Sequence, residues 1–231
     1  MVIFMKSYKE VLRRCPLFRD ISDDELIPML GCLGADVREY KRGDMIFSEG
    51  DTAKFLGIVL SGEVQIEQVD YYGNRDIVGS VGVGGIFGET FACAKVESLP
   101  VDVICVSDCE IMLVGVGRIT KSCSNACAFH SMVIYNLMQM VAEKNLMLHK
   151  KIEIISRRTT REKLMAYLLY EAKRAGSDTF EIPYDRQSLA DYLDVDRSGL
   201  SVEISKLRAE GIIEADKKHF TLLTGEFEMK E

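Results

Sequence analysis

The sequence contains no long hydrophobic run, and no apolar stretch approaches the roughly 18 residues that a membrane-spanning helix needs. The apolar start, Met1 to Met5, is interrupted by Lys6 and lacks a signal-peptide cleavage pattern. The seven cysteines are odd in number and lack the spacing of a disulfide framework, which fits a reducing compartment. We therefore expect a cytoplasmic protein with no membrane contact.

Chain-breaking residues are absent from a long central stretch. Residues 118–175 contain no glycine and residues 101–182 contain no proline, whereas twelve of the 18 glycines lie within residues 43–117. A turn-rich segment is therefore followed by one that can form a long helix. Short alternating or apolar runs in the turn-rich segment predict strands at 62–69, 77–78, 101–105 and 110–114, with a turn at 72–74. Many short strands of this kind predict a closed or double-sheet β-structure.

The breaker-free stretch carries a heptad pattern, in which positions spaced alternately by four and three residues are apolar except for one asparagine. These positions, named the seam below, are Ile134, Met138, Val141, Asn145, Leu148, Ile152 and Ile155. A second stripe lies on a neighbouring face at Phe129, Val133, Leu137, Met140 and Met147. One stripe can cover the β-structure while the other pairs with a second copy of the chain; the alternative is one helix buried on two sides within a single chain. We predict a homodimer, because a buried asparagine commonly fixes the register of paired helices.

Residues 185–207 have the spacing of a helix-turn-helix. Asp185 and Asp196 stand where N-caps are expected, and Ala190 is small enough for two helices to cross closely. Asp194 is one of the few non-glycine residue types that tolerates a left-handed turn between them. The predicted apolar face consists of Leu189, Leu193, Val195, Leu200, Ile204 and Leu207. Taken alone, the motif also fits a generic helical hairpin. Two capping boxes, Ser22 to Glu25 and Thr159 to Glu162, predict further helix starts.

A predicted wing follows the motif. The second helix is expected to end at Gly211, and the runs 212–215 and 219–222 flank Asp216-Lys217-Lys218, which predicts a hairpin with a basic tip. A basic tip can contact phosphates, so the sequence predicts a winged helix-turn-helix that binds double-stranded DNA. The residues predicted to contact DNA are Arg186, Gln187, Asp196, Arg197, Ser198, Gly199, Ser201, Val202, Lys206, Lys217 and Lys218.

The charge balance gives DNA binding little support. The net charge is −7, and from Ser156 onward 13 Lys and Arg stand against 15 Asp and Glu, a balance of −2. Binding therefore has to rely on a local basic patch and to weaken steeply with salt. A rival interpretation is a small-molecule-binding module whose winged helix contacts protein. An enzyme is not predicted, because no Cys-His-Asp arrangement is visible and residues 82–85 lack the lysine of a phosphate-binding loop.

Together these features resemble the Crp/Fnr superfamily of bacterial transcription regulators. The resemblance rests on Pro16-Leu17-Phe18 and on glycine turns within 40–51, 60–64 and 85–89, and it covers nearly the whole chain. It implies an α+β fold with an N-terminal jelly roll (double-stranded β-helix), a long central dimerisation helix and a C-terminal winged helix-turn-helix. It also implies a homodimer that binds an inverted repeat, an effector in the β-domain, and contact with RNA polymerase or blockage of it.

The resemblance divides the chain into three segments. Residues 1–118 would form a sensor domain similar to a cyclic-nucleotide-binding domain, residues 119–155 the dimerisation helix, and residues 156–231 the DNA-binding domain. On an inverted repeat, the two recognition helices would meet half-sites about one helical turn apart. The β-domain would control the angle of the central helices and so the distance between the recognition helices.

The predicted effector region departs from the members that bind cyclic AMP. In those members an arginine that follows the turn corresponding to Glu89 holds the cyclic phosphate, but here that position is Leu99, and no arginine lies between Arg75 and Arg118. A buried phosphate without a cationic partner is costly, and Lys95 lies early in the intervening loop. We therefore expect an effector other than a cyclic nucleotide. The residues predicted to bind it are Gly88, Glu89, Thr90, Leu99 and Pro100.

The recognition helix departs as well. Arg197 matches a family arginine that reads guanine, whereas Ser198 replaces a glutamate and Val202 replaces a second base-reading arginine. Valine cannot hydrogen-bond a base edge, but it can pack on a thymine methyl group. We therefore expect the DNA half-site of this protein to differ in sequence from that of the best-known members.

Five of the seven cysteines lie within residues 93–127. Some relatives sense oxygen through haem or an iron–sulfur cluster, so the alternative function is a redox, haem or iron–sulfur sensing regulator of the same fold. Its candidate ligands are Cys93, Cys123, Cys127 and His130. However, Cys105 and Cys109 share the strand parity of core residues, and no Cys-x-x-Cys spacing is present. We predict structural cysteines and no metal site.

Overall fold

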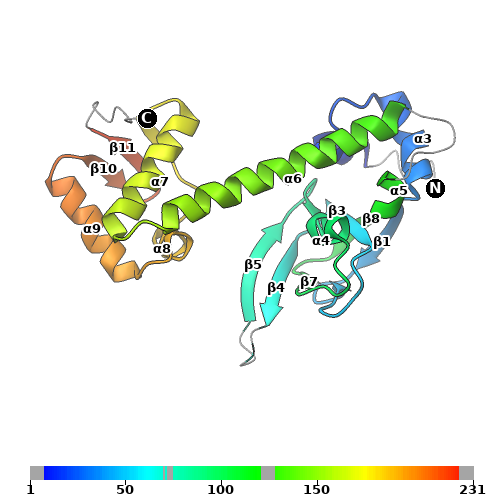
Figure 1. Cartoon of the computed structure of the whole chain (residues 1–231), viewed down its shortest axis with the longest axis horizontal. Coiled ribbons are helices and arrows are strands. Elements are labelled where there is room, and N and C mark those ends of the chain that lie inside the picture. Colours follow the sequence, from blue (N-terminus) through cyan, green and yellow to red (C-terminus); the bar gives the residue numbers. More distant parts are fainter. Residues whose placement is uncertain (1–7, 70, 72–74, 121–127, 224–231) are drawn as a thin grey trace. The chain divides into compact units, whose positions relative to one another are not determined.

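The computed structural model describes residues 8–69, 71, 75–120 and 128–223, and the chain forms two compact units, Met1–Glu143 and Lys144–Glu231 (Figure 1). The boundary falls inside the long helix α6 (Ala128–Ile155). This helix is the one predicted from the breaker-free stretch. It begins later than residue 119, because a separate short helix, α5 (Val116–Thr120), precedes it. In the described part of the chain, no helix is both long and apolar enough to cross a membrane.

Strands in the described part of the first unit form two four-stranded antiparallel sheets, with the orders β1-β8-β3-β6 and β2-β7-β4-β5. The strands are β1 (Asp36–Tyr40), β2 (Met45–Phe47), β3 (Phe55–Ser61), β4 (Val64–Val69), β5 (Arg75–Val81), β6 (Ile86–Phe87), β7 (Asp102–Cys105) and β8 (Cys109–Gly115). The predicted double-sheet structure and its predicted strands are confirmed. The predicted turn at 72–74 lies outside the described residues.

Strand β8 is buried on both faces. Ile111 and Leu113 belong to the core between the two sheets, whereas Met112 and Val114 belong to the core beneath the helices. Apolar partners on both sides explain why 110–114 is a continuous apolar run. Cys109 is 3% exposed and lies between the sheets, as predicted from its strand parity, and so does Cys105.

Helices cover one sheet of this unit. They are α2 (Lys9–Arg14), the 3-10 helix η1 (Pro16–Phe18), α3 (Asp23–Leu33) and the first turns of α6, while α4 (Glu89–Ala94) follows β6. The predicted capping box of Ser22 and Glu25 is present at the start of α3. Val133, Leu137 and Met140 of the second stripe are buried against this core, so the middle of that stripe covers the β-domain as predicted. Met147 is 63% exposed and does not take part, and the side chain of Phe129 lies outside the described part.

The second unit contains α7 (Thr160–Ala175), α8 (Arg186–Leu193) and α9 (Arg197–Ala209) together with β9 (Thr179–Glu181), β10 (Ile213–Asp216) and β11 (His219–Leu222). The predicted hairpin is confirmed as β10 and β11, and β9 joins it in a sheet of order β10-β11-β9. The capping box of Thr159 and Glu162 begins α7. The six residues of the predicted apolar face either line the single core of this unit or pack against it.

Candidate nucleic-acid interface

Local capping fixes helices α8 and α9 as the sequence predicted. The carboxylate of Asp185 accepts a hydrogen bond of 2.8 Å from the backbone N–H of Ser188, and that of Asp196 accepts one of 2.8 Å from Gly199. Asp194 has the left-handed φ of 52°, and Ala190 is fully buried between the helices. These contacts set where each helix begins, which in turn sets which side chains α9 presents outward.

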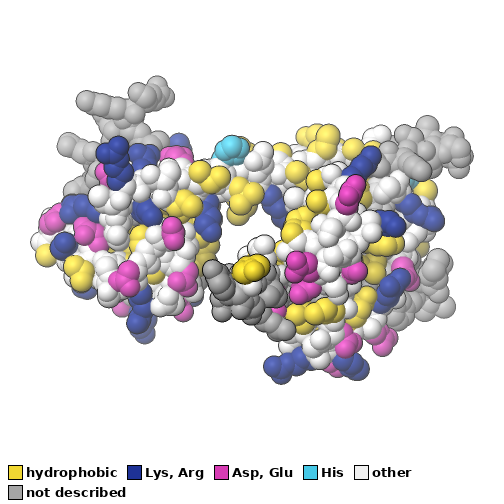
Figure 2. Space-filling view, turned by 60° about the horizontal axis from the view of Figure 1, so that its bottom comes forward, with side chains coloured by type: hydrophobic (Ala, Val, Ile, Leu, Met, Phe, Trp, Pro, Cys, Tyr) yellow, Lys and Arg dark blue, Asp and Glu magenta, His cyan; other side chains and the backbone are white. Residues whose placement is uncertain are grey.

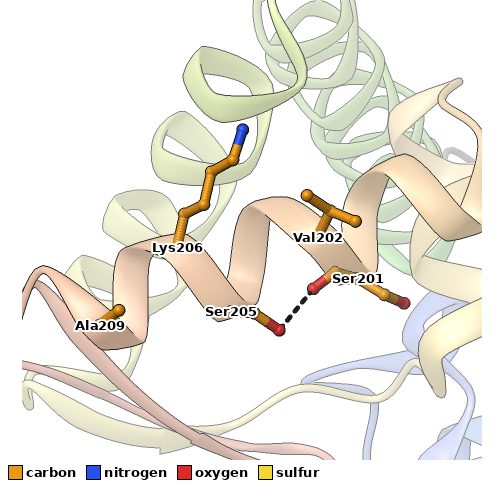
Figure 3. Close-up of a pocket in the computed structure, with 5 residues that line it drawn as sticks. All are labelled: Ser201, Val202, Ser205, Lys206 and Ala209. Atoms are coloured by element: carbon orange, nitrogen blue, oxygen red, sulfur yellow. Dashed lines mark hydrogen bonds between the residues drawn. The ribbon is translucent and has the colours of Figure 1, made fainter.

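The exposed face of α9 is largely apolar. Ser201, Val202, Ser205, Lys206 and Ala209 line a shallow hollow of about 470 Å³ on this face (Figure 3). The Ser205 hydroxyl donates a hydrogen bond of 2.9 Å to the carbonyl of Ser201, whose own hydroxyl donates one of 2.9 Å to the carbonyl of Arg197. Both serine hydrogens are thus committed to the helix backbone, and Val202 is 54% exposed. Carbon atoms therefore dominate the central part of this face, with the Lys206 ammonium beside it.

Arg197 and Ser198, in the first turn of α9, have different surroundings. The Arg197 side chain is exposed. Ser198 instead donates its hydroxyl hydrogen to the Asp196 carboxylate, and this bond together with the Gly199 N–H lowers the pKa of Asp196 below its ordinary value. Arg197 is consequently the side chain in this turn that is placed to reach a base edge, while Asp196, Ser198 and Gly199 form the cap.

The two predicted contacts on α8 are engaged within the unit. The Arg186 guanidinium lies over the Phe220 ring, 5.9 Å from its centroid, with its Nη1 atom buried and without a hydrogen-bond partner. Burial lowers the pKa of Arg186. Gln187 donates a hydrogen bond of 2.8 Å to Asp191, one turn along α8. Arg186 therefore stabilises the packing of α8 on the wing as well as presenting part of its charge to solvent.

The two lysines at the tip of the wing have different surroundings. Asp216 pairs with His219, so Lys217 and Lys218 form a two-residue turn in which Lys217 has a φ of 52°. The Lys218 ammonium donates a hydrogen bond of 2.8 Å to the carbonyl of Pro183, whereas Lys217 is exposed. In Figure 2 basic and acidic side chains are interspersed over the surface of this unit, which agrees with its small net charge.

The seam on α6 is exposed to solvent in the single chain. Met138, Leu148 and Ile152 are 59%, 60% and 59% exposed, and Asn145 is exposed too. The side chain of Val141 is 37% exposed, and the residues at the two ends of the seam, Ile134 and Ile155, are half-buried. Figure 2 shows hydrophobic side chains at the surface along this helix. The alternative of a helix buried on two sides within one chain is therefore wrong for the seam.

The predicted effector region surrounds the start of α4. Gly88 has a left-handed φ of 77°, and Glu89 is only 2% exposed, with the neighbouring Thr90 hydroxyl donating a hydrogen bond of 3.2 Å to its carboxylate. Leu99 is 4% exposed and is fixed by backbone hydrogen bonds of 2.9 Å to Gly50 and to Asp51. The residue that the resemblance aligns with an arginine is therefore a buried apolar one, and Pro100 next to it is exposed.

The candidate metal or haem ligands are only partly described. Cys93 is exposed, and partial burial together with the Glu89 charge raises the pKa of its thiol. His130 is buried, with Nε2 4.0 Å from the sulfur of Cys32, a neighbour that sequence reasoning missed, and with Nδ1 lacking a partner. Cys123 and Cys127 lie outside the described residues. Among the residues that the structure does describe, no three His, Cys, Asp or Glu side chains cluster closely enough to hold a metal.

Sequence reasoning also missed Ser205 and Ala209 on the exposed face of α9. Their signal was the helical spacing, because they follow Ser201 by four and eight residues and so lie on the same face.

Comparison with known proteins finds a family model on each unit. The model described as a cyclic nucleotide-binding domain matches residues 37–125, and the model of a Crp-like helix-turn-helix domain matches residues 162–226. The transcriptional activator protein FnrL of Cereibacter sphaeroides is 23% identical over 202 residues, which are 81% of this chain and 76% of that protein. The probable transcriptional regulator flp of Lacticaseibacillus casei is 26% identical over 220 residues, 91% of this chain and 93% of that protein.

A solved structure shows the same fold. The c-di-GMP responsive global regulator CLP of Xanthomonas campestris aligns with a TM-score of 0.56 over 85% of this chain and 98% of that chain, at 19% identity. At this identity the likeness concerns the fold alone.

Proposed function

We propose that the chain acts as a homodimer on an inverted repeat in double-stranded DNA. It belongs to the Crp/Fnr superfamily of transcription regulators, with an effector-binding type of β-domain and a helix-turn-helix domain. Helix α9 enters the major groove of each half-site, and the wing contacts the neighbouring phosphates. An effector that is not a cyclic nucleotide controls the affinity. Contact with RNA polymerase, or its exclusion from the promoter, belongs to the same proposal.

The observation that carries this proposal is the placement of Arg197. It is exposed in the first turn of α9, on a helix whose start is fixed by the Asp196 cap. The N-terminal residues of a recognition helix are the ones that reach base edges, and an arginine there can bind guanine through two hydrogen bonds. Lys206 and Lys217, which are also exposed, supply the charge for phosphates on either side.

The exposed seam supports the dimer. Its apolar side chains repeat over the length of α6, and a twofold pairing of two such helices covers them on both copies at once. A dimer also doubles the number of phosphate contacts, which offsets the weak charge of a single DNA-binding unit.

The proposed effector is not a cyclic nucleotide because of Leu99. Its side chain is buried and offers no hydrogen-bond donor, and the resemblance aligns it with the phosphate-binding arginine. A cyclic phosphate in this place would lose its hydration without gaining a cation.

Selection from a random double-stranded DNA library with the full chain tests the proposal. We expect an enriched inverted repeat that contains guanine in each half-site, and Arg197→Ala lowers the affinity for it. The matched control is Arg208→Ala, which removes an exposed arginine from the last turn of the same helix. If no sequence is enriched, or if both variants bind like the wild type, the winged helix serves another partner, such as a protein.

A second candidate function is sensing through haem or an iron–sulfur cluster. The observation that favours it is the buried His130, whose Nδ1 has no partner and whose Nε2 faces the Cys32 sulfur. The absorption spectrum of the protein purified without oxygen tests it. A Soret band or a broad charge-transfer shoulder would support this candidate and make Cys93, Cys123, Cys127 and His130 the first ligands to replace. A featureless spectrum would contradict it.

A further inference from the structure

A surface pocket of about 650 Å³ lies in the first unit, at the far end of α4 from Glu89. Its volume is within the range of pockets that bind small molecules. The residues that matter here are Lys54, Phe55, Cys93, Lys95, Gly115 and Arg118. They come from the start of β3, the end of α4, the end of β8 and the start of α5.

Three of these residues are cations, and no acidic residue lines the pocket. Lys54, Lys95 and Arg118 form no ion pair with any residue in the described ranges. In the part of the chain that the structure describes, the three cations stay unpaired although the chain has 36 acidic residues and only 29 basic ones. Like charges gathered around one hollow repel each other and create a positive potential there, which an anion relieves.

The fold fixes the positions of Lys54 and Arg118. Phe55 pairs with Gly115 across β3 and β8, and the N–H of Val116 donates a hydrogen bond of 3.1 Å to the carbonyl of Lys54. The starts of β3 and α5 are therefore tied together at the pocket. The Arg118 guanidinium in turn lies against Gly34, where an added Cβ would come within 2.9 Å of its Nη1 atom. A side chain at residue 34 would therefore displace the guanidinium, and the left-handed φ of 62° at this position also favours glycine.

Lys95 occupies an unfavourable backbone conformation. It caps the C-terminus of α4 with φ 54° and ψ 42°, the left-handed region that glycine usually occupies at this position. A residue with a Cβ is strained in this conformation, because its Cβ comes close to the carbonyl oxygen. Strain of this kind gathers at functional sites, and here it brings a third cation to the pocket.

We infer that this pocket binds a small organic anion. Its carboxylate or phosphate group is neutralised by Lys54, Lys95 and Arg118, and its apolar body packs on Phe55, which is 44% exposed. The site differs from the region around Glu89 and Leu99, because three cations line it, whereas Leu99 is the apolar residue that the resemblance aligns with a phosphate-binding arginine. The inference deepens the effector part of the proposed function and rests on it, since α4 links the pocket to Glu89 at its other end.

Cys93 provides a reporter inside the pocket. The rate at which iodoacetamide alkylates Cys93 in the full chain is followed by peptide mass spectrometry, with and without phenyl phosphate at millimolar concentration. We expect phenyl phosphate to slow the alkylation of Cys93 several-fold and to leave that of the exposed Cys32 unchanged. Phenol, the neutral counterpart, does not protect. A variant with Lys54→Gln, Lys95→Gln and Arg118→Gln loses the protection, and the continued resistance of the buried Cys15 to alkylation shows that the variant is folded.

Several results would overturn the inference. The first is that phenyl phosphate does not protect Cys93. The second is that it protects Cys93 equally in the triple variant or in the single variant Lys95→Gln. The third is that inorganic phosphate alone protects equally, which would show a site that binds charge without an organic body. Protection by polyglutamate but not by phenyl phosphate would instead indicate an acidic protein partner. The DNA selection described above is independent of this assay, so loss of DNA binding and loss of anion binding are told apart.

Discussion

The side-chain amide of Asn136 in α6 donates a hydrogen bond of 2.8 Å to the carbonyl oxygen of Arg19, and a second one of 3.1 Å to that of Leu17. Asn136 is 2% exposed. The amide therefore joins the long helix to the end of η1, in the core that covers one sheet of the β-domain.

We expect Asn136→Ala to lower the free energy of unfolding by about 1–3 kcal/mol, because the two carbonyl oxygens lose their donor without regaining water. Urea denaturation followed by far-UV circular dichroism measures the change. Gln139→Ala is the control, since the amide of Gln139 bonds to the Tyr135 hydroxyl at the surface. Equal destabilisation by both variants would show that the helix sequence matters rather than the contact.

The two asparagines of α6 show what the sequence could and could not predict. Asn145 stood out because it interrupts a heptad, which is a local pattern, and the structure leaves it exposed on the single chain. Asn136 gave no signal, since its partners lie 117 and 119 residues away in the sequence. The helix-turn-helix was predicted nearly residue by residue, because caps and a left-handed turn are set by neighbouring residues. The stacking of Arg186 on Phe220 and the bond from Lys218 to Pro183 depend on tertiary packing and were not predictable.

The exposed seam leads to a matched pair of variants on α6. Leu148 lies on the seam and Leu146 lies on another face, and they are 60% and 70% exposed. We expect Leu148→Glu to dissociate the dimer, because paired carboxylates would face each other in an apolar interface. Leu146→Glu leaves the dimer intact. Sedimentation equilibrium distinguishes the two, and a wild-type monomer at micromolar concentration would contradict the dimer itself.

A buried carboxylate in the second unit predicts a pH dependence of stability. Glu171 is 5% exposed, and burial raises its pKa above the ordinary value, although Arg174 at 2.9 Å offsets part of the effect. Between the pKa of the unfolded chain, about 4.3, and the higher folded value, the folded state holds more protons. Its stability therefore falls as pH rises through this window.

We expect Glu171→Gln to unfold at a higher urea concentration than the wild type at neutral pH, and the difference to vanish below about pH 4. Tyrosine fluorescence follows the transition, since the chain has no tryptophan and Tyr167 packs in this unit. Glu181→Gln, at an exposed position, is the control and should leave the pH profile unchanged. A wild-type stability that rises from pH 4 to pH 7 relative to Glu171→Gln would contradict the assignment.

The exposed guanidinium of Arg197 predicts that a lysine in its place lowers the specificity for one DNA sequence while the positive charge is kept. Arg197→Lys retains the cation but cannot make two parallel hydrogen bonds to guanine. We expect its affinity for the selected repeat to fall by about 1–3 kcal/mol, while binding to unrelated DNA stays near that of the wild type. Fluorescence anisotropy on both DNAs at one salt concentration measures the difference. An equal fall on both would mean that Arg197 contacts phosphate rather than a base.

The apolar face of α9 predicts that part of the DNA sequence is read through methyl groups. Val202 is 54% exposed, and the hydroxyl hydrogens of Ser201 and Ser205 are bonded to backbone carbonyls of the helix. Replacing single thymines of the half-site by deoxyuridine removes only a methyl group. At the position that faces Val202 we expect the affinity to fall by about 0.8 kcal/mol, or about fourfold. Val202→Ala abolishes the difference between the two DNAs, whereas Ser205→Ala, which alters a hydroxyl already committed to the helix, preserves it. A methyl dependence that persists in Val202→Ala would place another side chain against the thymine.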